Sequence, residues 1–284
     1  MIEVRQEVHS AIAPSAVPLP WLLRMLRRLP MPRKLGLLER LFGNSIKRFG
    51  ICWVETAEGP VWKLNLDDPC DRWMVFGDYE GAVQMNWIRG WLKDGGNVID
   101  SGTNIGQMLM YFSRSSNVTV LGFEPHPEVY EWVSSCIERN ALTNVSVISV
   151  GLGDSTCSAT LRLNGPRSTM RADWYLDSDL KEVQIDVRAL DDVLSHRGIT
   201  RVRLWKLDVE GLELVALRGA RRSLLQGRID AVLFEVNVER FEELRDFFAE
   251  VGYAIYANSR AGLRPVSSAA GHGNLIALPK SAAN

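Results

Sequence analysis

The sequence predicts an α/β protein whose central sheet is largely parallel. Short β-rich runs alternate with segments in which apolar residues recur at helical spacing, and this alternation is typical of parallel sheets. A glycine-rich turn also joins the first of these runs directly to a helix, as in many ligand-binding α/β proteins. Strand candidates begin near seven positions: Val98, Val118, Val145, Val202, Ala231, Tyr253 and Asn274.

Residues 1–50 are predicted to form a basic, amphipathic, helical leader. Between residues 21 and 50, eight basic residues accompany a single acid, Glu39. Apolar residues fall on one face of each of two helical stretches: Leu22, Met25, Leu26 and Leu29, then Leu38, Leu41 and Phe42. Such a segment can lie on an anionic membrane surface. It can equally pack its leucines against the main domain or a second subunit, with its arginines solvated, and we favour this packing.

Residues 51–95 are predicted to lead into the main domain as a hairpin followed by a helix. The runs Ile51–Thr56 and Val61–Leu66 flank a Glu-Gly-Pro turn, which is typical of two antiparallel strands. A helical stretch with two tryptophans follows. The main domain is then expected to occupy residues 96–284.

The most informative stretch of the main domain is the turn after its first strand. Its pattern is Asp-x-Gly-x-Asn-x-Gly, formed by Asp100, Gly102, Asn104 and Gly106, and a helix opens at Ile105. Strand, glycine turn and helix together place backbone N–H groups beside a ligand with little side-chain bulk in the way. The pattern differs from the Gly-x-Gly-x-x-Gly of dinucleotide sites and from phosphate loops. A glycine turn of purely structural origin is the alternative.

An acidic residue ends the second predicted strand. Glu124 lies twenty-four positions after Asp100. In a strand–helix–strand unit, this spacing brings the carboxylate to the carboxyl end of the neighbouring strand, where it can accept hydrogen bonds from both hydroxyls of a ribose. Glu124 can also cap the helix that begins after Pro125-His126-Pro127. The two roles are compatible, and the pattern favours an adenosine-type ligand.

A third block completes a family pattern. The strand Leu204–Leu207 runs into Asp208-Val-Glu210-Gly-Leu-Glu213, ahead of another helix. Together with the turn at Asp100 and the Glu124-Pro pair, this Lys-x-Asp-x-Glu-Gly-x-Glu block resembles the FkbM family of S-adenosylmethionine-dependent methyltransferases. The resemblance covers about residues 56–279.

The resemblance implies a doubly wound, Rossmann-like sheet of seven strands, the class I methyltransferase fold, with the last strand antiparallel. It also implies S-adenosylmethionine as cofactor and O-methyl transfer to a hydroxyl, of a sugar in a glycan, glycolipid or glycosylated natural product. The residues themselves indicate only the cofactor geometry. The alternatives are a non-sugar small-molecule hydroxyl as acceptor, or a nucleotide-binding oxidoreductase or epimerase, which Asn104 and the missing Gly-x-Gly-x-x-Gly disfavour.

Cofactor contacts are expected after the first three strands. We expect Asp100 and the backbone from Gly102 to Gly106 to hold the amino acid end of the cofactor, and Glu124 to hold its ribose. Asp154 follows the third strand and is a candidate for the adenine amine, with a turn-forming role as the alternative.

Asp208 is the first candidate for catalysis. A sulfonium methyl group is already electrophilic, so the protein must mainly align an acceptor oxygen. A carboxylate at the end of the fourth strand can accept or orient the proton of that hydroxyl. Glu210 is a second catalytic candidate. Glu210 and Glu213 can instead cap the following helix, and for Glu213 this role is at least as well supported. Lys206 can pair with a carboxylate.

Two histidines and one pair of acids complete the candidates. His126, beside Glu124, and His272, before the last strand, can serve as bases near neutral pH, with a surface position as the alternative for each. Asp208 together with Glu235, which ends the fifth strand, can hold a divalent cation through oxygen ligands. Metal dependence is left open.

Residues 156–187 interrupt the alternation and are interpreted as an insertion. Two β-like runs, Ser158–Leu163 and Glu182–Val187, enclose a polar loop at residues 165–173. Loops on a rigid scaffold commonly supply specificity, so an insertion here is well placed to cover the acceptor.

Composition excludes several functional classes. The 284 residues, 46 % of them hydrophobic, can bury one sizeable core, and the net charge of −1 predicts no general attraction to nucleic acid. We expect a cytoplasmic protein without a secretory signal or membrane span, and leave contact with the inner membrane face and homo-oligomerisation open. Four cysteines without Cys-x-x-Cys pairing are expected to be reduced and buried: Cys52, Cys70, Cys136 and Cys157.

Overall fold

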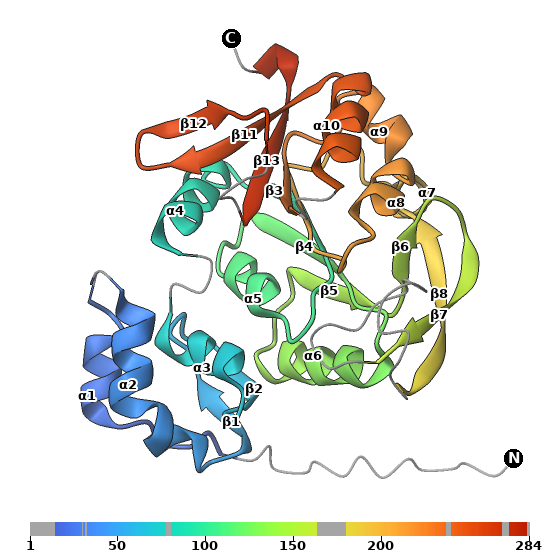
Figure 1. Ribbon diagram of the computed structural model, residues 1–284. Helices are drawn as coiled ribbons and strands as arrows, with labels where there is room; N and C mark the ends of the chain where they lie inside the picture. The colour runs from blue at the N-terminus through green and yellow to red at the C-terminus, as the bar shows by residue number, and fades with distance from the viewer. Residues whose placement is uncertain are drawn as a thin grey trace, which may run out of the picture. The chain divides into compact units, whose positions relative to one another are not determined.

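The computed structural model describes residues 15–29, 31, 33–77, 81–163, 180–236, 240–268 and 273–282. The chain divides into two compact units, residues 1–77 and residues 78–284 (Figure 1). No helix in these described ranges is long and apolar enough to cross a membrane.

The first unit combines helices with a two-stranded sheet. Its elements are α1 (Trp21–Leu26), α2 (Lys34–Lys47), β1 (Ile51–Glu55), β2 (Val61–Asn65) and α3 (Pro69–Phe76). The predicted hairpin is confirmed, since β1 and β2 pair in antiparallel fashion with Ile51 opposite Asn65. The helix α3 was not predicted. It begins with a proline, and the Asp68 side chain accepts a hydrogen bond from the Cys70 N–H, a favourable start for a helix.

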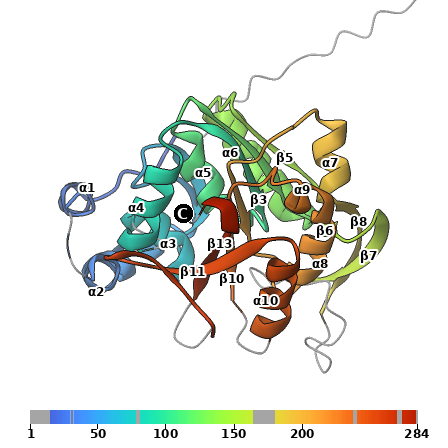
Figure 2. The ribbon, with the colours of Figure 1, turned by 90° about the horizontal axis from the view of Figure 1, so that it is seen from above.

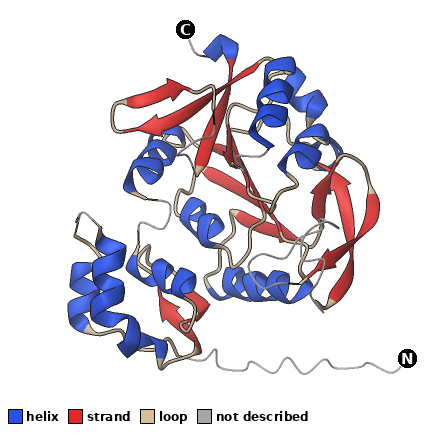
Figure 3. Ribbon diagram, viewed as in Figure 1, coloured by secondary structure: helices blue, strands red, loops and turns tan. Residues whose placement is uncertain are grey.

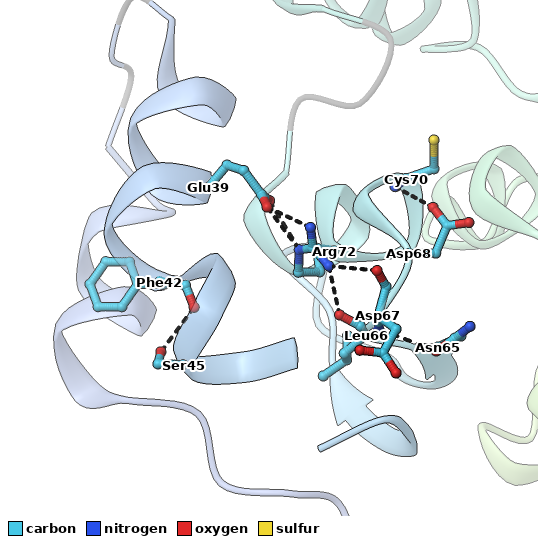
Figure 4. A network of polar contacts seen from close by, with 9 residues as sticks. All are labelled: Glu39, Phe42, Ser45, Asn65, Leu66, Asp67, Asp68, Cys70 and Arg72. Carbon is cyan, nitrogen blue, oxygen red and sulfur yellow. Dashed lines mark hydrogen bonds and ion pairs between the residues drawn. The ribbon is translucent and has the colours of Figure 1, made fainter. Parts of the chain in front are cut away.

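A buried arginine connects the parts of this first unit (Figure 4). The guanidinium of Arg72, on α3, donates from Nε to both carboxylate oxygens of Glu39 at 3.1 Å, and thereby joins α3 to α2. Its Nη1 donates to the backbone oxygens of Leu66 at 2.7 Å and Asp67 at 3.0 Å. Because the charge is paired and most of its donors are used, the burial of Arg72 is tolerated.

The apolar face that we predicted for α1 is not the one buried within the first unit, and its packing against the main domain or a second subunit stays a prediction. Leu23 and Arg27 are the residues of this segment that point inward. Arg27 tolerates burial because its Nη2 lies 2.6 Å from Glu55 Oε1 and its Nη1 donates to the Glu55 carbonyl at 2.9 Å. Three of the apolar residues on the predicted face are exposed in this chain: Leu22, Met25 and Leu29.

The second helix of the leader follows the prediction only in part. Leu38 is buried as expected, and Phe42 is half-buried. Leu41 is exposed, whereas Ile46 supplies an inward contact that we did not predict. The inward face of α2 is therefore shifted from the expected one.

The second unit is built on an eight-stranded sheet with the order β12-β11-β13-β10-β9-β3-β4-β5. Its strands are β3 (Gly96–Ser101), β4 (Val118–Phe123), β5 (Val145–Ile148), β9 (Leu204–Leu207), β10 (Val232–Glu235), β11 (Tyr253–Ser259), β12 (Gly262–Pro265) and β13 (Asn274–Pro279). All seven predicted strands are present. The predicted antiparallel last strand is confirmed, because β13 runs antiparallel to both β10 and β11.

The eighth strand, β12, was not predicted. It forms a hairpin with β11 at the edge of the sheet, and its residues are mostly exposed. An exposed edge strand needs no continuous apolar run, so the pattern that identified the other strands is missing here.

Helices cover both faces of this sheet, as the doubly wound fold requires (Figures 2 and 3). One side carries α4 (Ala82–Trp91), α5 (Gln107–Ser113) and α6 (Pro127–Arg139). The other side carries α7 (Leu190–His196), α8 (Glu213–Arg218), α9 (Arg221–Leu225) and α10 (Phe241–Glu250). The strands between them are almost fully buried, and the chain is an α/β protein with a doubly wound, mostly parallel central sheet.

The predicted insertion, residues 156–187, takes part in a small separate sheet. This sheet contains β7 (Cys157–Arg162) and β8 (Glu182–Ala189), which the insertion supplies almost entirely, and β6 (Gly151–Gly153), which precedes it. The strand β8 pairs in parallel with β6 and in antiparallel fashion with β7, so the two predicted β-like runs are confirmed. The polar loop at residues 165–173 lies outside the described residues.

The cysteines only partly follow the prediction. All four are free thiols, as expected. Cys136 is buried and Cys52 is half-buried, but Cys70 and Cys157 are exposed, so the predicted burial is wrong for these two.

Candidate active site

A cavity of about 100 Å³ opens at the carboxyl ends of β3, β4 and β9. Parallel sheets bind their ligands at this edge, where the order of the strands reverses. The cavity is lined by residues from all three predicted motifs. The small sheet of β6, β7 and β8 contributes further wall residues from β6 and β7. The topology therefore brings together segments that lie more than one hundred positions apart in the sequence, such as Asp100 and Asp208.

The turn after β3 needs its glycine for steric reasons. Gly102 has a φ of 75°, and a Cβ atom there would lie 1.7 Å from the backbone oxygen of Asp208. The first motif consequently touches the third through backbone atoms. Asn104 also adopts a left-handed conformation, and Gly106, with a φ of 85°, precedes the first residue of α5. Gly106 shapes the turn but does not line the cavity.

Two side chains at this turn fix it against the sheet. Asp100 is buried at the end of β3 and lines the cavity. The hydroxyl of Thr103 donates to the Asp100 backbone oxygen at 2.9 Å and accepts from the Phe123 N–H at 3.1 Å. Thr103 was missed in the sequence because its role depends on a contact with β4 and not on the local pattern.

Glu124 lies at the end of β4, at the bottom of the cavity. Its Oε2 accepts from the backbone N–H of Asn104 at 2.8 Å, and its Oε1 accepts from the backbone N–H of His126 at 2.9 Å. Burial raises the pKa of Glu124 to about 7, although the two N–H donors act in the opposite direction. Each oxygen keeps a second lone pair, so the carboxylate can still accept from two ribose hydroxyls.

His126 is a buried imidazole in the wall of the same cavity. Its Nδ1 has no hydrogen-bond partner among the described residues, and burial lowers the pKa of the ring. The side chain is therefore a neutral polar group that faces a ligand space. A carboxylate, an unpartnered ring nitrogen and a backbone turn without side-chain bulk form a set that fits an adenosine-containing cofactor.

The third motif places the ammonium group of Lys206 beside the carboxylate of Asp208. Lys206 is buried on β9, and its Nζ lies 2.7 Å from Asp208 Oδ2. Burial opposes ionisation of Asp208, but Lys206 and a hydrogen bond with Glu235 outweigh it and lower the pKa of this carboxyl. Asp208 is thus an anion at neutral pH, and the predicted pairing of Lys206 with a carboxylate is confirmed.

Glu235 is the neighbour of Asp208 at the end of β10, where it is partly open to solvent. Desolvation and the charge of Asp208 raise the pKa of Glu235 to about 8. Its carboxyl group therefore donates the hydrogen bond to Asp208 at neutral pH. No group of three or more metal-ligating side chains is assembled within the described ranges, and a metal at Asp208 and Glu235 stays a hypothesis.

The two other acids of the third motif have different roles. Glu210 lines the cavity with a φ of 50°, next to Asp208 in the turn. Glu213 is buried, and its Oε1 accepts from the backbone N–H of Gly211 at 3.1 Å. It thus stabilises the turn ahead of α8, which fits the capping alternative more closely than a catalytic role.

Asp154 and Glu235 do not line the cavity. Asp154 is exposed, is absent from the cavity wall, and accepts a hydrogen bond from the neighbouring Ser155 hydroxyl. This geometry fits the turn-forming alternative. Glu235 touches Asp208 without lining the cavity, and His272 lies outside the described residues.

Apolar wall residues were also missed in the sequence. Val129, Val150, Leu152 and Leu161 line the cavity from α6, the segment after β5, β6 and β7. Leu161 shows that the inserted sheet contributes to the site. A leucine in an insertion carries no chemical signal, so only the fold could identify it.

Curated relatives are methyltransferases. The chain is 32 % identical over 142 residues to "Methyltransferase 1" of Beauveria bassiana, an alignment that covers 43 % of this chain and 57 % of that protein. It is 30 % identical over 154 residues to "Methyltransferase sdnD" of Sordaria araneosa, covering 43 % of this chain and 59 % of the relative. The chain thus spans less than two thirds of the length of these relatives.

Similar solved structures include two methyltransferases. One is an S-adenosylmethionine-dependent O-methyltransferase of Thermotoga maritima, at 14 % identity and a TM-score of 0.39, with 70 % of this chain and 65 % of that chain covered. The other is a human methyltransferase 10 domain containing protein, at 12 % identity and a TM-score of 0.41, with 91 % of this chain and 96 % of that chain covered.

The family is identified by the segment that builds the cavity. The model of the methyltransferase FkbM domain matches residues 100–255 of the 284, a range that includes the turn after β3, Glu124 and the block at Asp208. The chain therefore belongs to the FkbM methyltransferase family.

Proposed function

We propose that this protein transfers a methyl group from S-adenosylmethionine to a hydroxyl oxygen, and that the hydroxyl belongs to a sugar in a glycan, glycolipid or glycosylated natural product. Membership of the family supports the methyl transfer and the cofactor. The observation that supports an oxygen acceptor is the Asp208 carboxylate, which is held ionised in the cavity wall by Lys206.

The residues of the β3 and β4 ends are proposed to bind the cofactor. The backbone from Gly102 to Gly106 and the Asp100 carboxylate hold its amino acid end, and Glu124 accepts from its ribose. His126 is proposed as a binding residue near Glu124 and not as the base, because it follows β4 whereas Asp208 follows β9, and β3 lies between these strands. When bound, the cofactor supplies a methyl group on a positively charged sulfur.

Asp208 is proposed to orient and deprotonate the acceptor. The acceptor hydroxyl donates a hydrogen bond to the ionised carboxylate, which aligns the oxygen lone pair with the methyl carbon. As the new oxygen–carbon bond forms, the methyl–sulfur bond breaks and its electron pair stays on sulfur, while the hydroxyl proton passes to Asp208. Lys206 keeps the carboxylate ionised before the reaction, and Glu235 fixes its orientation. Glu210, in the same turn, is proposed to contact the acceptor.

Binding and transfer experiments test this function separately. Calorimetry with S-adenosylhomocysteine and with NAD distinguishes a methyltransferase from an oxidoreductase or epimerase, and we expect binding of the first ligand alone. Methyl-labelled S-adenosylmethionine is then incubated with glycosides and with non-sugar alcohols. Label on a glycoside oxygen is the expected result. Label on non-sugar alcohols alone contradicts the sugar acceptor but leaves O-methyl transfer intact, and NAD binding without S-adenosylhomocysteine binding contradicts both.

A further inference from the structure

The outward face of α1 is apolar although the helix is short. Its inward residues are Leu23 and Arg27, which are 0 % and 3 % exposed. Trp21 and Met25, four residues apart on α1, are 71 % and 59 % exposed and lie on the side opposite to Leu23. Leu29, which follows the helix, is 48 % exposed. A buried arginine beneath exposed leucine, methionine and tryptophan is the reverse of the usual surface helix.

The neighbouring helix α2 also carries exposed apolar side chains. It packs against α1 within the first unit (Figure 1). Leu37 and Leu41, one turn apart, are 42 % and 55 % exposed, while Leu38 and Ile46 fill the interior. Six large apolar side chains of this segment are therefore exposed, and we refer to them together as the leader face: Trp21, Leu22, Met25, Leu29, Leu37 and Leu41.

The charge around the leader face is positive. Six exposed basic residues lie on or beside the two helices: Arg24, Arg28, Arg33, Arg40, Lys47 and Arg48. The single acid between residues 21 and 50, Glu39, is bound to Arg72 and does not offset them. Arg24 Nη2 lies 3.5 Å from Glu55 Oε2, so this arginine is paired with an acid outside the segment.

We propose that the leader face docks onto the surface of an anionic phospholipid bilayer. The apolar side chains would enter the boundary between headgroups and acyl chains, where tryptophan is favoured, and the arginines and lysines would reach the lipid phosphates. The positive charge selects this occupant, because an apolar protein partner would need no ring of cations. The inference is independent of the proposed methyl transfer, since it rests on residues of the first unit alone.

Vesicle binding of the full chain tests the proposal. We expect co-sedimentation with vesicles of phosphatidylcholine mixed with phosphatidylglycerol, and none with phosphatidylcholine alone. Binding should weaken as salt is raised, because the attraction to phosphate is screened. Reversal of one exposed charge, Arg28→Glu, should weaken binding about fivefold or more.

A matched pair of variants separates the leader face from general surface hydrophobicity. Leu41 and Leu225 are both leucines with 55 % exposure, but Leu225 lies on α9 in the second unit. Leu41→Glu should lower the vesicle partition constant about tenfold or more, and Leu225→Glu should leave it unchanged. Circular dichroism shows that both variants are folded. Equal effects of the two substitutions, or no binding of the wild-type chain to anionic vesicles, would overturn the proposal.

Fluorescence quenching locates the contact. Lipids brominated near the headgroup should quench the wild-type chain more than the Trp21→Phe variant, because Trp21 is placed in the lipid. Equal quenching of the two chains contradicts this placement. Light scattering covers the remaining alternative: a dimer that Leu41→Glu dissociates would identify a second copy as the occupant and overturn the bilayer proposal.

Discussion

Gly102 and Asp208 are in backbone contact across the candidate site. A Cβ atom at position 102 would lie 1.7 Å from the Asp208 backbone oxygen, far inside van der Waals contact. The proposed cofactor turn and the proposed catalytic carboxylate are thereby held in one fixed relationship. Because backbone atoms carry this contact, side-chain rearrangement cannot relieve an overlap there.

The first prediction concerns this contact. Gly102→Ala should lower the free energy of unfolding by about 2 kcal/mol or more, because the methyl group overlaps a carbonyl and φ is positive. Gly198→Ala is the matched control, since Gly198 has a φ of 66° with open space around its missing Cβ. Gly198→Ala should lower the free energy of unfolding by only about 1 kcal/mol. Urea denaturation measures both, and equal losses would show that the overlap is relieved.

The second prediction concerns the stability of the first unit. Asp71 is buried, and its pKa is raised to about 7, mainly by burial. The folded state therefore favours the protonated form. Stability is greatest below the unfolded pKa, near 4, and falls as pH rises to about 7. We expect a loss of about 1–3 kcal/mol between these limits.

Asp71→Asn tests this origin of the pH dependence. The amide keeps an acceptor for the Asn65 N–H but cannot ionise. Urea denaturation of the variant and of the wild type is followed by circular dichroism at pH 5 and at pH 8, which together cover most of the range from about pH 4 to about pH 7. The free energy of unfolding should differ less between these two pH values in the variant than in the wild type. An unchanged pH dependence would assign the effect to another group.

The sequence was sufficient for strands that are buried on both faces. Such strands are continuous apolar runs, and the carboxyl ends of three of them identified Asp100, Glu124 and Asp208. The exposed strand β12 lacks that signal. The contact between Asp208 and Glu235 follows from the adjacency of β9 and β10, which no local pattern specifies.

The leader shows why helical periodicity alone is insufficient. Periodicity tells which residues share a face but not which face is buried. In α1 the buried face is set by Glu55, which lies twenty-eight positions after Arg27 in the sequence. The carboxylate and the backbone carbonyl of Glu55 accept hydrogen bonds from the buried Arg27 guanidinium. Once Arg27 points inward, Met25 must point outward.

The third prediction concerns cofactor affinity. With its pKa at about 7, Glu124 is largely protonated in the free protein at pH 6, whereas ribose hydroxyls need the carboxylate as acceptor. Affinity for S-adenosylhomocysteine should therefore rise with pH up to about 8, with net proton release on binding at pH 6. Calorimetry in buffers of different ionisation enthalpy measures that release.

Two variants identify the group that loses the proton. Glu124→Gln should weaken binding by about 1.5–3 kcal/mol, the range for hydrogen bonds to a charged group, and abolish the proton release. Glu128→Gln, at an exposed position of α6, should change neither. Proton release that persists without Glu124 would exclude it as the ribose acceptor.

The fourth prediction concerns catalysis. Asp208→Asn keeps the shape of the side chain but removes its charge and its ability to take a proton. Turnover should fall about 10²–10⁴-fold, the usual scale for a positioned acid–base group, while S-adenosylhomocysteine affinity stays within about threefold. Glu235→Gln keeps a hydrogen-bond donor for Asp208 and should lower turnover less than about tenfold. Asp192→Asn, at an exposed position of α7, is the control and should have no effect.

The pattern of these defects distinguishes a side-chain base from a metal site. If Asp208 takes the proton itself, wild-type activity survives chelation, and magnesium does not restore the Asp208→Asn variant. If Asp208 and Glu235 instead hold a cation, chelation abolishes wild-type activity, added magnesium restores it, and Glu235→Gln is as damaging as Asp208→Asn. A defect of Asp208→Asn that is confined to cofactor affinity would make Asp208 a binding residue. His126 and Glu210, which also line the cavity, would then be the groups to test as the base.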